Sequence, residues 1–324
     1  MFVAAWTFEI SALWTVVPVS KQRHLFLGIF RIREAEMEWK SLPDLLKSPD
    51  HYLKSFNAYK TSILKFSKYT AWVDGVLSEA VVDKLQAVMG RQEELRILGV
   101  GSGDGSVDYT ILKRLLHHFP RINNRVVEPF SEQLRQYKAL ALSKAHELPG
   151  VDHHWRQQTI EQYQKEGDLT KFHFVSAIHT LYYVEKSSLM YLYDCLEPGG
   201  VLLVVLESEN SGMSQLWYHF LQDQPRYVSS ADLQSSLERR GIPHKKIRQR
   251  CHIDITMCFG ETSAEGKMLM DFFSHVVDFD KVASKGFQRS MMEYLASSHC
   301  SKKCGDEVWL IVEWDAVVIS KPRE

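Results

Sequence analysis

Alternating glycines between Gly99 and Gly105 are the residues whose spacing points most directly to chemistry in this chain of 324 residues. They end an apolar run that begins at Leu95, and a helical pattern follows them. Glycine adopts backbone dihedral angles closed to other residues and lets a ligand approach the main chain closely. A second apolar run ends at Glu128, where a carboxylate can accept hydrogen bonds from both hydroxyls of a ribose. This order predicts a nucleotide-type cofactor site.

The glycine spacing separates two classes of cofactor. A dinucleotide site has the pattern G-x-G-x-x-G, whose third glycine lets the helix pack close to the strand. If the pattern starts at Gly99, Asp104 stands where the third glycine should be, and if it starts at Gly101, Ser106 stands there. A carboxylate at 104 would repel a pyrophosphate, but it suits the amino group of a cationic sulfonium ligand. The motif therefore favours S-adenosylmethionine over a nicotinamide cofactor, and a tight turn with a solvated Glu128 is the alternative without a ligand.

Strand-like and helix-like patterns alternate around this motif. Short apolar runs predict strands over residues 96–100, 125–127, 153–157, 172–178 and 201–206. Helical periodicity lies between them over residues 108–118, 131–145 and 189–196. Such alternation is typical of a mostly parallel sheet, whose ligands lie outside the carboxyl ends of the strands. We therefore expect Gly101, Glu128 and Ile178 to meet at one edge of the sheet.

The remaining patterns divide the chain into further parts. Residues 1–50 are rich in aromatic and β-branched residues, and we interpret them as an appended segment that is strand-like or poorly ordered. Residues 51–324 are the expected main domain, with residues 91–207 as its cofactor-binding core. We expect residues 51–90 and 208–306 to supply substrate-binding and lid elements. The apolar run 307–319 is the predicted final strand, at an edge of the sheet.

Composition limits the classes of partner. Lys and Arg number 39 against 40 Asp and Glu, a balance that gives no electrostatic signature of binding to nucleic acid or to an anionic membrane. The N-terminal apolar residues show neither the basic start of a secretory signal nor the length of a membrane span. The five cysteines lack a C-x-x-C pair, which predicts reduced thiols and no metal site. We expect a cytoplasmic monomer that acts on a small molecule.

Several segments resemble one enzyme family when they are taken together and in order. The chain resembles the histamine N-methyltransferases from about residue 51 to residue 319. The matching segments are Tyr52–Phe56, Ile97–Gly105, Ile122–Pro129, Leu181–Val184, Ser211-Gly212 with Leu216-Trp217, and Asp254-Ile255 with Cys258-Phe259. The resemblance implies an S-adenosylmethionine-dependent methyltransferase with a Rossmann-like class I α/β fold. That fold is a doubly wound, mostly parallel seven-stranded sheet with helical substrate-binding and lid elements.

The resemblance also implies which residues bind the methyl donor. At the positions that match the family's motifs stand Gly101, Glu128, Gln133 and Ile178. A serine of the family's adenine region is replaced by Ile160, which would form an apolar wall beside Thr159. Together with the glycine turn, the predicted cofactor-binding residues are Gly101, Gly103, Asp104, Glu128, Gln133, Thr159 and Ile178.

The acceptor side departs from the family pattern. The family holds its substrate with a carboxylate on an early helix and an asparagine on the last strand, but these positions match Lys65 and Val312 here. Glu313 or Asp315 would offer a substitute charge, yet the period of two in a strand places both on the face opposite Val312. The predicted acceptor-binding residues are aromatic: Tyr183, Trp217 and Phe259. Each has an ordinary place in a hydrophobic core as its alternative.

Methyl transfer from a sulfonium is an in-line displacement that depends on positioning, so we predict no acid–base catalytic residue. His179 is a candidate proton acceptor or a loop histidine without a role. Tyr182 is expected to face away from Tyr183, because neighbours on an extended segment face opposite ways. The sequence thus predicts an N-methyltransferase for a small amine or imidazole, with altered substrate-anchoring residues. A catalytically silent protein that binds S-adenosylmethionine is the alternative.

Overall fold

The computed structural model describes residues 34–66, 68–89, 94–221, 226–260 and 263–323. Most of the segment expected to be appended, residues 1–33, lies outside the described residues. Residues 34–41 form a helix, and Trp39 from it is buried against Phe220 and Phe287 with ring centroids 5.9 Å apart in both pairs. Burial of so large a side chain attaches the described part of this segment to the main body.

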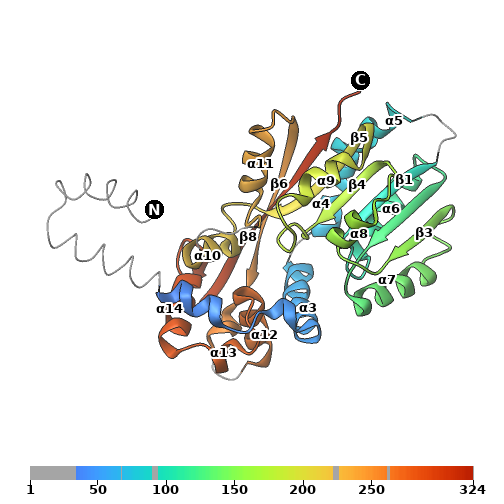
Figure 1. The fold of residues 1–324 in the computed structure, drawn as a ribbon. Coiled ribbons are helices and arrows are strands. Elements are labelled where there is room, and N and C mark those ends of the chain that lie inside the picture. The colour runs from blue at the N-terminus through green and yellow to red at the C-terminus, as the bar shows by residue number, and fades with distance from the viewer. Residues whose placement is uncertain (1–33, 67, 90–93, 222–225, 261–262, 324) are drawn as a thin grey trace, which may run out of the picture.

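The centre of the molecule is one sheet of eight strands with the order β3-β2-β1-β4-β5-β8-β6, in which β7 pairs with β8 (Figure 1). Strands β1 to β5 pair in parallel, and β6 to β8 are antiparallel to their neighbours. The strands are β1 (Leu95–Val100), β2 (Ile122–Val127), β3 (Val151–Arg156), β4 (Phe172–Ile178), β5 (Leu196–Glu207), β6 (His244–Asp254), β7 (Ser301–Cys304) and β8 (Glu307–Ser320). The expected Rossmann-like sheet is confirmed, and the short β7 adds one strand to the predicted seven.

The last strand is not an edge strand, and this part of the prediction was wrong. β8 lies between β5 and β6 and pairs with both over long registers. Every residue from Val312 to Ile319 is buried, including Glu313 and Asp315. A long and nearly uninterrupted apolar run is typical of a strand covered on both faces. The edge is β6 instead, whose burial alternates in the manner of a half-exposed strand.

Helices cover both faces of the sheet. One face packs against α4 (Tyr69–Ala80), α5 (Val82–Gln86) and α6 (Ser106–Leu116), and the other against α8 (Ile160–Glu166), α9 (Ser188–Asp194) and α11 (Ser230–Glu238). α7 (Ser131–Ser143) packs on β2 through Leu134 and Tyr137. Alternate residues of β5 enter the two cores: Val201, Leu203 and Val205 on the α4 face, and Leu202, Val204 and Leu206 on the other. This arrangement confirms the doubly wound fold.

A second layer of helices gathers around the ends of β6 and β8 that extend past the parallel strands (Figure 1). It contains α3 (Pro49–Phe66), α10 (Gly212–Phe220), η2 (Thr256–Phe259), α12 (Ala264–Ser274), α13 (Phe279–Val282) and α14 (Lys285–Leu295), with η1 (Leu45–Lys47) before α3. His51 Nε2 and Asp271 Oδ2 lie 2.6 Å apart and join α3 to α12. Asp271 also accepts a hydrogen bond from the N–H of Phe279. These contacts fix α3 over the carboxyl edge of the sheet.

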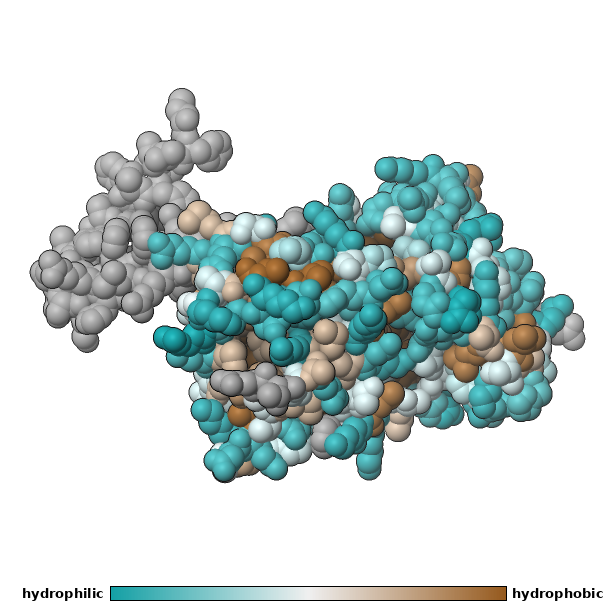
Figure 2. Space-filling model, turned by 90° about the horizontal axis from the view of Figure 1, so that it is seen from below, coloured by the Kyte–Doolittle hydropathy of each residue, from teal (hydrophilic) through white to brown (hydrophobic). Residues whose placement is uncertain are grey.

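Three further features of the described residues concern the hydropathy of the helices, the distribution of hydrophobic residues on the surface, and the cysteines. None of their helices combines the length and the hydropathy needed to cross a membrane. On the face seen from below, hydrophobic residues form separate patches among hydrophilic ones (Figure 2). All five cysteines are free in the structure, and Cys195, Cys258 and Cys300 are buried.

Candidate functional site

The glycine turn after β1 has a backbone that only glycine adopts easily. Gly101 and Gly103 have φ angles of +62° and +56°. A Cβ atom on Gly101 would overlap Oγ1 and Cβ of Thr180, the second residue after β4. A Cβ on Gly103 would meet only Gln133 Oε1, at 4.0 Å, so the space beside Gly103 is open. The turn therefore presents bare main chain to the edge of the sheet.

Glu128 follows β2 and turns back toward this glycine turn. It is buried, and its two oxygens accept hydrogen bonds of 2.9 Å from the N–H groups of Gly103 and Phe130. Burial raises the pKa of the Glu128 carboxyl, although both N–H donors oppose the rise. Each carboxylate oxygen still has a free lone pair, so it can accept a second donor such as a hydroxyl.

Gln133 lies in the first turn of α7, on the other side of the glycine turn. It is buried, and its Oε1 has no hydrogen-bond partner among the described residues. A buried amide oxygen without a partner is costly, and such groups are rare in native structures. A donor from a ligand at this edge would remove that cost.

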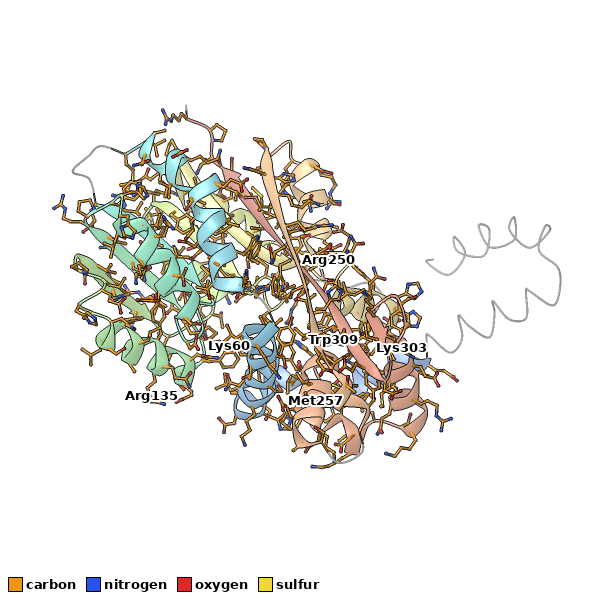
Figure 3. The ribbon with its side chains drawn as sticks, turned by 180° about the vertical axis from the view of Figure 1, so that it is seen from behind. Lys60, Arg135, Arg250, Met257, Lys303 and Trp309 are labelled. Carbon is orange, nitrogen blue, oxygen red and sulfur yellow. The ribbon has the colours of Figure 1, made fainter. Side chains whose placement is uncertain are left out.

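Asp104 forms an ion pair with Lys60, which extends from α3 toward the sheet (Figure 3). Lys60 Nζ also donates to Ser106 Oγ at 3.1 Å, and Asp104 Oδ1 accepts from the N–H of Ser106. Burial opposes ionisation of Asp104, but the hydrogen bond and charge of Lys60 outweigh it and lower the pKa of the carboxyl. Opposite charges from two distant segments thus meet beside the glycine turn, and sequence reasoning missed the part that Lys60 plays.

Thr159 and Ile178 complete the predicted donor residues. Thr159 is the N-cap of α8, where its hydroxyl accepts from the N–H of Gln162 at 3.3 Å and its own N–H donates to Gln162 Oε1. Its hydroxyl is therefore engaged with the helix, and Ile160 beside it is buried. Ile178 is the last residue of β4 and is half-buried.

A cavity of about 580 Å³ connects these residues with an aromatic region. All seven predicted cofactor-binding residues line it, as do two of the three predicted acceptor-binding residues, Tyr183 and Trp217. Phe259, in η2, is not among the lining residues. Ligand pockets of proteins usually have volumes of about 300–1,000 Å³, so this cavity has the size of a site for small-molecule ligands.

The aromatic half of the cavity combines loop, helix and strand residues. Tyr183 and Trp217 are joined there by Tyr52 and Phe272, and the hydroxyl of Tyr52 donates to that of Tyr183 at 3.3 Å. Trp217 is held by a hydrogen bond of 2.9 Å from its Nε1 to the carbonyl of Phe273. Tyr52 and Phe272 lie in the parts of the chain expected to supply substrate-binding and lid elements, but neither was among the predicted acceptor-binding residues.

Tyr182 also lines the cavity, contrary to the expectation that it faces away from Tyr183. The expectation assumed an extended segment. The chain turns here instead, because the N–H of Tyr183 donates to the carbonyl of Thr180 at 3.0 Å. Side chains do not alternate in a turn, and the two tyrosine rings lie 5.9 Å apart in an edge-to-face arrangement. The hydroxyl of Tyr182 accepts a hydrogen bond from the N–H of Glu207.

His179 lies between the two halves and lines the cavity. Its φ angle of +51° is uncommon for a residue with a Cβ and costs on the order of 1–3 kcal/mol, a strain found mostly at functional sites. Burial lowers the pKa of His179 to about 4, so the ring is neutral near pH 7. Nδ1 lies 3.4 Å from the hydroxyl of Tyr182.

Glu207 is the one acid of the acceptor half among the described lining residues, and it was missed in the sequence. It ends the apolar run of β5 just as Glu128 follows that of β2, so the same signal was present at both positions. Neither Lys65 nor Val312 lines the cavity. Glu313 is buried but forms ion pairs with Arg248 and Arg250, away from the cavity.

Comparisons with known proteins agree with this arrangement. No family model matches the chain. Histamine N-methyltransferase B of Xenopus laevis is 30% identical over 273 residues, which cover 80% of this chain and 92% of that protein. The enzyme of Mus musculus is 31% identical over 245 residues, 70% of this chain and 83% of that protein. The enzyme of Danio rerio is 29% identical over 272 residues, 80% and 91% of the two chains.

Similar solved structures include the YcgJ protein of Bacillus subtilis, with a TM-score of 0.48, 12% identity and coverage of 78% of this chain and 100% of that one. The plantazolicin methyltransferase BamL has a TM-score of 0.47 and 14% identity, and covers 90% and 98% of the two chains. The curated relatives carry the assignment, because their matches extend over most of both chains. This chain belongs to the histamine N-methyltransferase family of S-adenosylmethionine-dependent class I methyltransferases.

Proposed function

We propose that this protein transfers the methyl group of S-adenosylmethionine to a nitrogen of a small amine or imidazole, within the cavity described above. The observation that carries the proposal is the continuity of that cavity. It joins the glycine turn and Glu128 to the aromatic region of Tyr183 and Trp217. A donor and an acceptor bound in one cavity are held close to each other, which is the main requirement of an in-line displacement.

The residues of the donor half fit S-adenosylmethionine. Glu128 has free lone pairs for the ribose hydroxyls, and the unpartnered Oε1 of Gln133 can accept a donor from the ligand. The open space beside Gly103 allows close approach of a ligand, and Gly101 also lines the cavity. The ligand's amino acid carries both charges, and the pair of Asp104 and Lys60 offers one partner for its ammonium and one for its carboxylate.

The acceptor half supports transfer to an uncharged nitrogen. When bound, S-adenosylmethionine supplies the methyl group: the nitrogen lone pair forms the N–CH3 bond as the S–CH3 bond breaks with its electrons left on sulfur. Tyr183 and Trp217 limit the orientations of the acceptor and exclude water from the point of transfer. His179 is neutral near pH 7, but the burial that lowers its pKa to about 4 makes it too weak a base to hold the proton that the methylated product releases, so that proton passes to solvent.

A binding experiment with two ligands tests the donor half. S-adenosylhomocysteine carries the amino acid, whereas methylthioadenosine has the same nucleoside and lacks it. We expect Glu128→Ala to weaken both ligands in calorimetry, by about 1–3 kcal/mol. Asp104→Asn should weaken S-adenosylhomocysteine alone. If the wild-type protein binds neither of the two ligands, the proposal is refuted.

Activity separates an enzyme from a silent binder. Transfer of radioactive methyl from S-adenosylmethionine is measured with a panel that includes histamine, other imidazoles and aryl alkylamines. Methylation of any member supports the enzyme. Donor binding without transfer to any member would instead favour the catalytically silent protein of the same fold.

A further inference from the structure

Glu207 has a place in the acceptor half that the proposed function does not yet use. It is 5% exposed and lies at the carboxyl end of β5. Its Oε1 accepts hydrogen bonds from Tyr59 Oη and Trp314 Nε1, both at 3.0 Å, and its Oε2 accepts one from Ser211 Oγ. A carboxylate accepts about four hydrogen bonds, so a position on Oε2 remains for another donor.

The charge of Glu207 has no ion-pair partner among the described residues, since all three of its side-chain donors are neutral. The acids next to it in the sheet differ in this respect. Glu313 is paired with Arg248 and Arg250, and Asp315 with Arg248. Both face the opposite side of β8 from Trp314, which is the cross-strand neighbour of Glu207. An unpaired buried charge is costly, and a cationic ligand would offset that cost.

Aromatic rings around Glu207 favour a cation in the same place. These rings and Glu207 all line the cavity, and we call them together the inner cluster: Tyr59, Tyr69, His179, Tyr182, Glu207 and Trp314. The rings of Tyr69 and Trp314 lie 5.0 Å apart edge to face. The faces of such rings attract an alkylammonium group. His179 is neutral near pH 7, so no fixed cation of the inner cluster competes for the carboxylate.

We propose that Glu207 binds the ammonium group of the methyl acceptor. The proposal rests on the proposed function and adds to it the residue that holds the charged end of the acceptor. An ammonium has no lone pair, so the nitrogen held by Glu207 is not the one that is methylated. The acceptor is therefore an alkylamine with a second, uncharged nitrogen, such as one in an imidazole ring. Glu207 supplies from β5 the negative charge that Lys65 cannot supply from α3.

The test compares charged probes with uncharged analogues in the full chain saturated with S-adenosylhomocysteine. Calorimetry at about pH 8 keeps the acid ionised and gives the Kd of histamine against 4-methylimidazole, and of 2-phenylethylamine against 2-phenylethanol. The variants are Glu207→Gln, which keeps the shape and removes the charge, and Ser211→Ala, which removes a donor and keeps the charge. Glu209→Gln is the matched control, because Glu209 pairs with Arg248 and does not line the cavity.

The expected result is that at least one amine binds the wild-type protein about tenfold or more tightly than its uncharged analogue. Glu209→Gln and Ser211→Ala should keep that preference, and Glu207→Gln should lose it. Equal affinity of each amine and its analogue in the wild-type protein would overturn the proposal without any variant. Retention of the preference by Glu207→Gln would overturn it too. Failure of S-adenosylhomocysteine to bind the wild-type protein would refute the proposed function instead.

Discussion

Replacement of Glu207 by glutamine should remove a pH dependence of stability that a single buried group creates. The amide has the shape of the acid. Its oxygen can accept from Tyr59 and Trp314, and its NH2 can donate to Ser211 Oγ, so the surrounding hydrogen bonds persist. Burial raises the pKa of the Glu207 carboxyl from 4.5 to about 7, and these neutral donors only partly oppose the rise. The nearby charge of Glu313 adds to it.

The raised pKa of Glu207 determines the direction and the size of the change in unfolding free energy with pH. Below pH 4.5 the Glu207 carboxyl is protonated in the folded and the unfolded chain alike. As the pH rises to 7, the unfolded chain loses this proton while the folded chain keeps it, so the unfolding free energy falls. Each pH unit contributes about 1.4 kcal/mol, which gives a loss of about 3 kcal/mol across the interval. Above pH 7 the loss is complete and constant.

Urea denaturation from pH 4.5 to pH 8 measures this difference between the wild-type protein and Glu207→Gln. The unfolding free energy of the wild type minus that of the variant should fall by about 3 kcal/mol and level off near pH 7. Five other titratable groups near Glu207 keep their charge between pH 5 and 8. Burial raises the pKa of Tyr59, Tyr69, Tyr182 and Cys251, and it lowers the pKa of His179. A difference that stays constant over the whole range would refute the reasoning.

Three further changes have defined outcomes. Gly101→Ala should abolish binding of S-adenosylhomocysteine in calorimetry with an unchanged circular dichroism spectrum, since its Cβ would overlap Thr180 at a positive φ and displace the glycine turn. Undiminished affinity would contradict a role of this turn in donor binding. Trp39→Ala should lower the unfolding free energy by about 3–5 kcal/mol, and a loss under about 1 kcal/mol would show that residues 34–41 do not belong to the core. Trp314→Phe removes a hydrogen bond that lowers the pKa of Glu207, so the stability transition should move to higher pH, and a shift to lower pH would contradict the assigned bond.

The donor half could be predicted from local sequence because its determinants are local. A glycine turn at the end of one strand and an acid after the next depend only on strand order, and the parallel sheet brings Gly101 and Glu128 together. The same reasoning placed Glu313 and Asp315 on one face of the last strand, which the structure confirms. What it did not show was that β8 inserts between β5 and β6, since strand order is set by long-range pairing.

The acceptor half was harder because it depends on contacts between distant segments. Tyr59 meets Glu207 across 148 positions of sequence. The donor half has one such contact, in which Lys60 meets Asp104 across 44 positions, and that contact was missed as well. An aromatic stripe on α3 predicts a buried helix face but not its neighbour. Glu207 has the same local signal as Glu128, because each stands at the end of an apolar strand.

The two neighbouring residues of α3, Tyr59 and Lys60, reach opposite halves of the cavity, one to Glu207 and the other to Asp104. The same helical turn thus supports a contact in each half. We expect that occupancy of one half changes the Michaelis constant measured for the other.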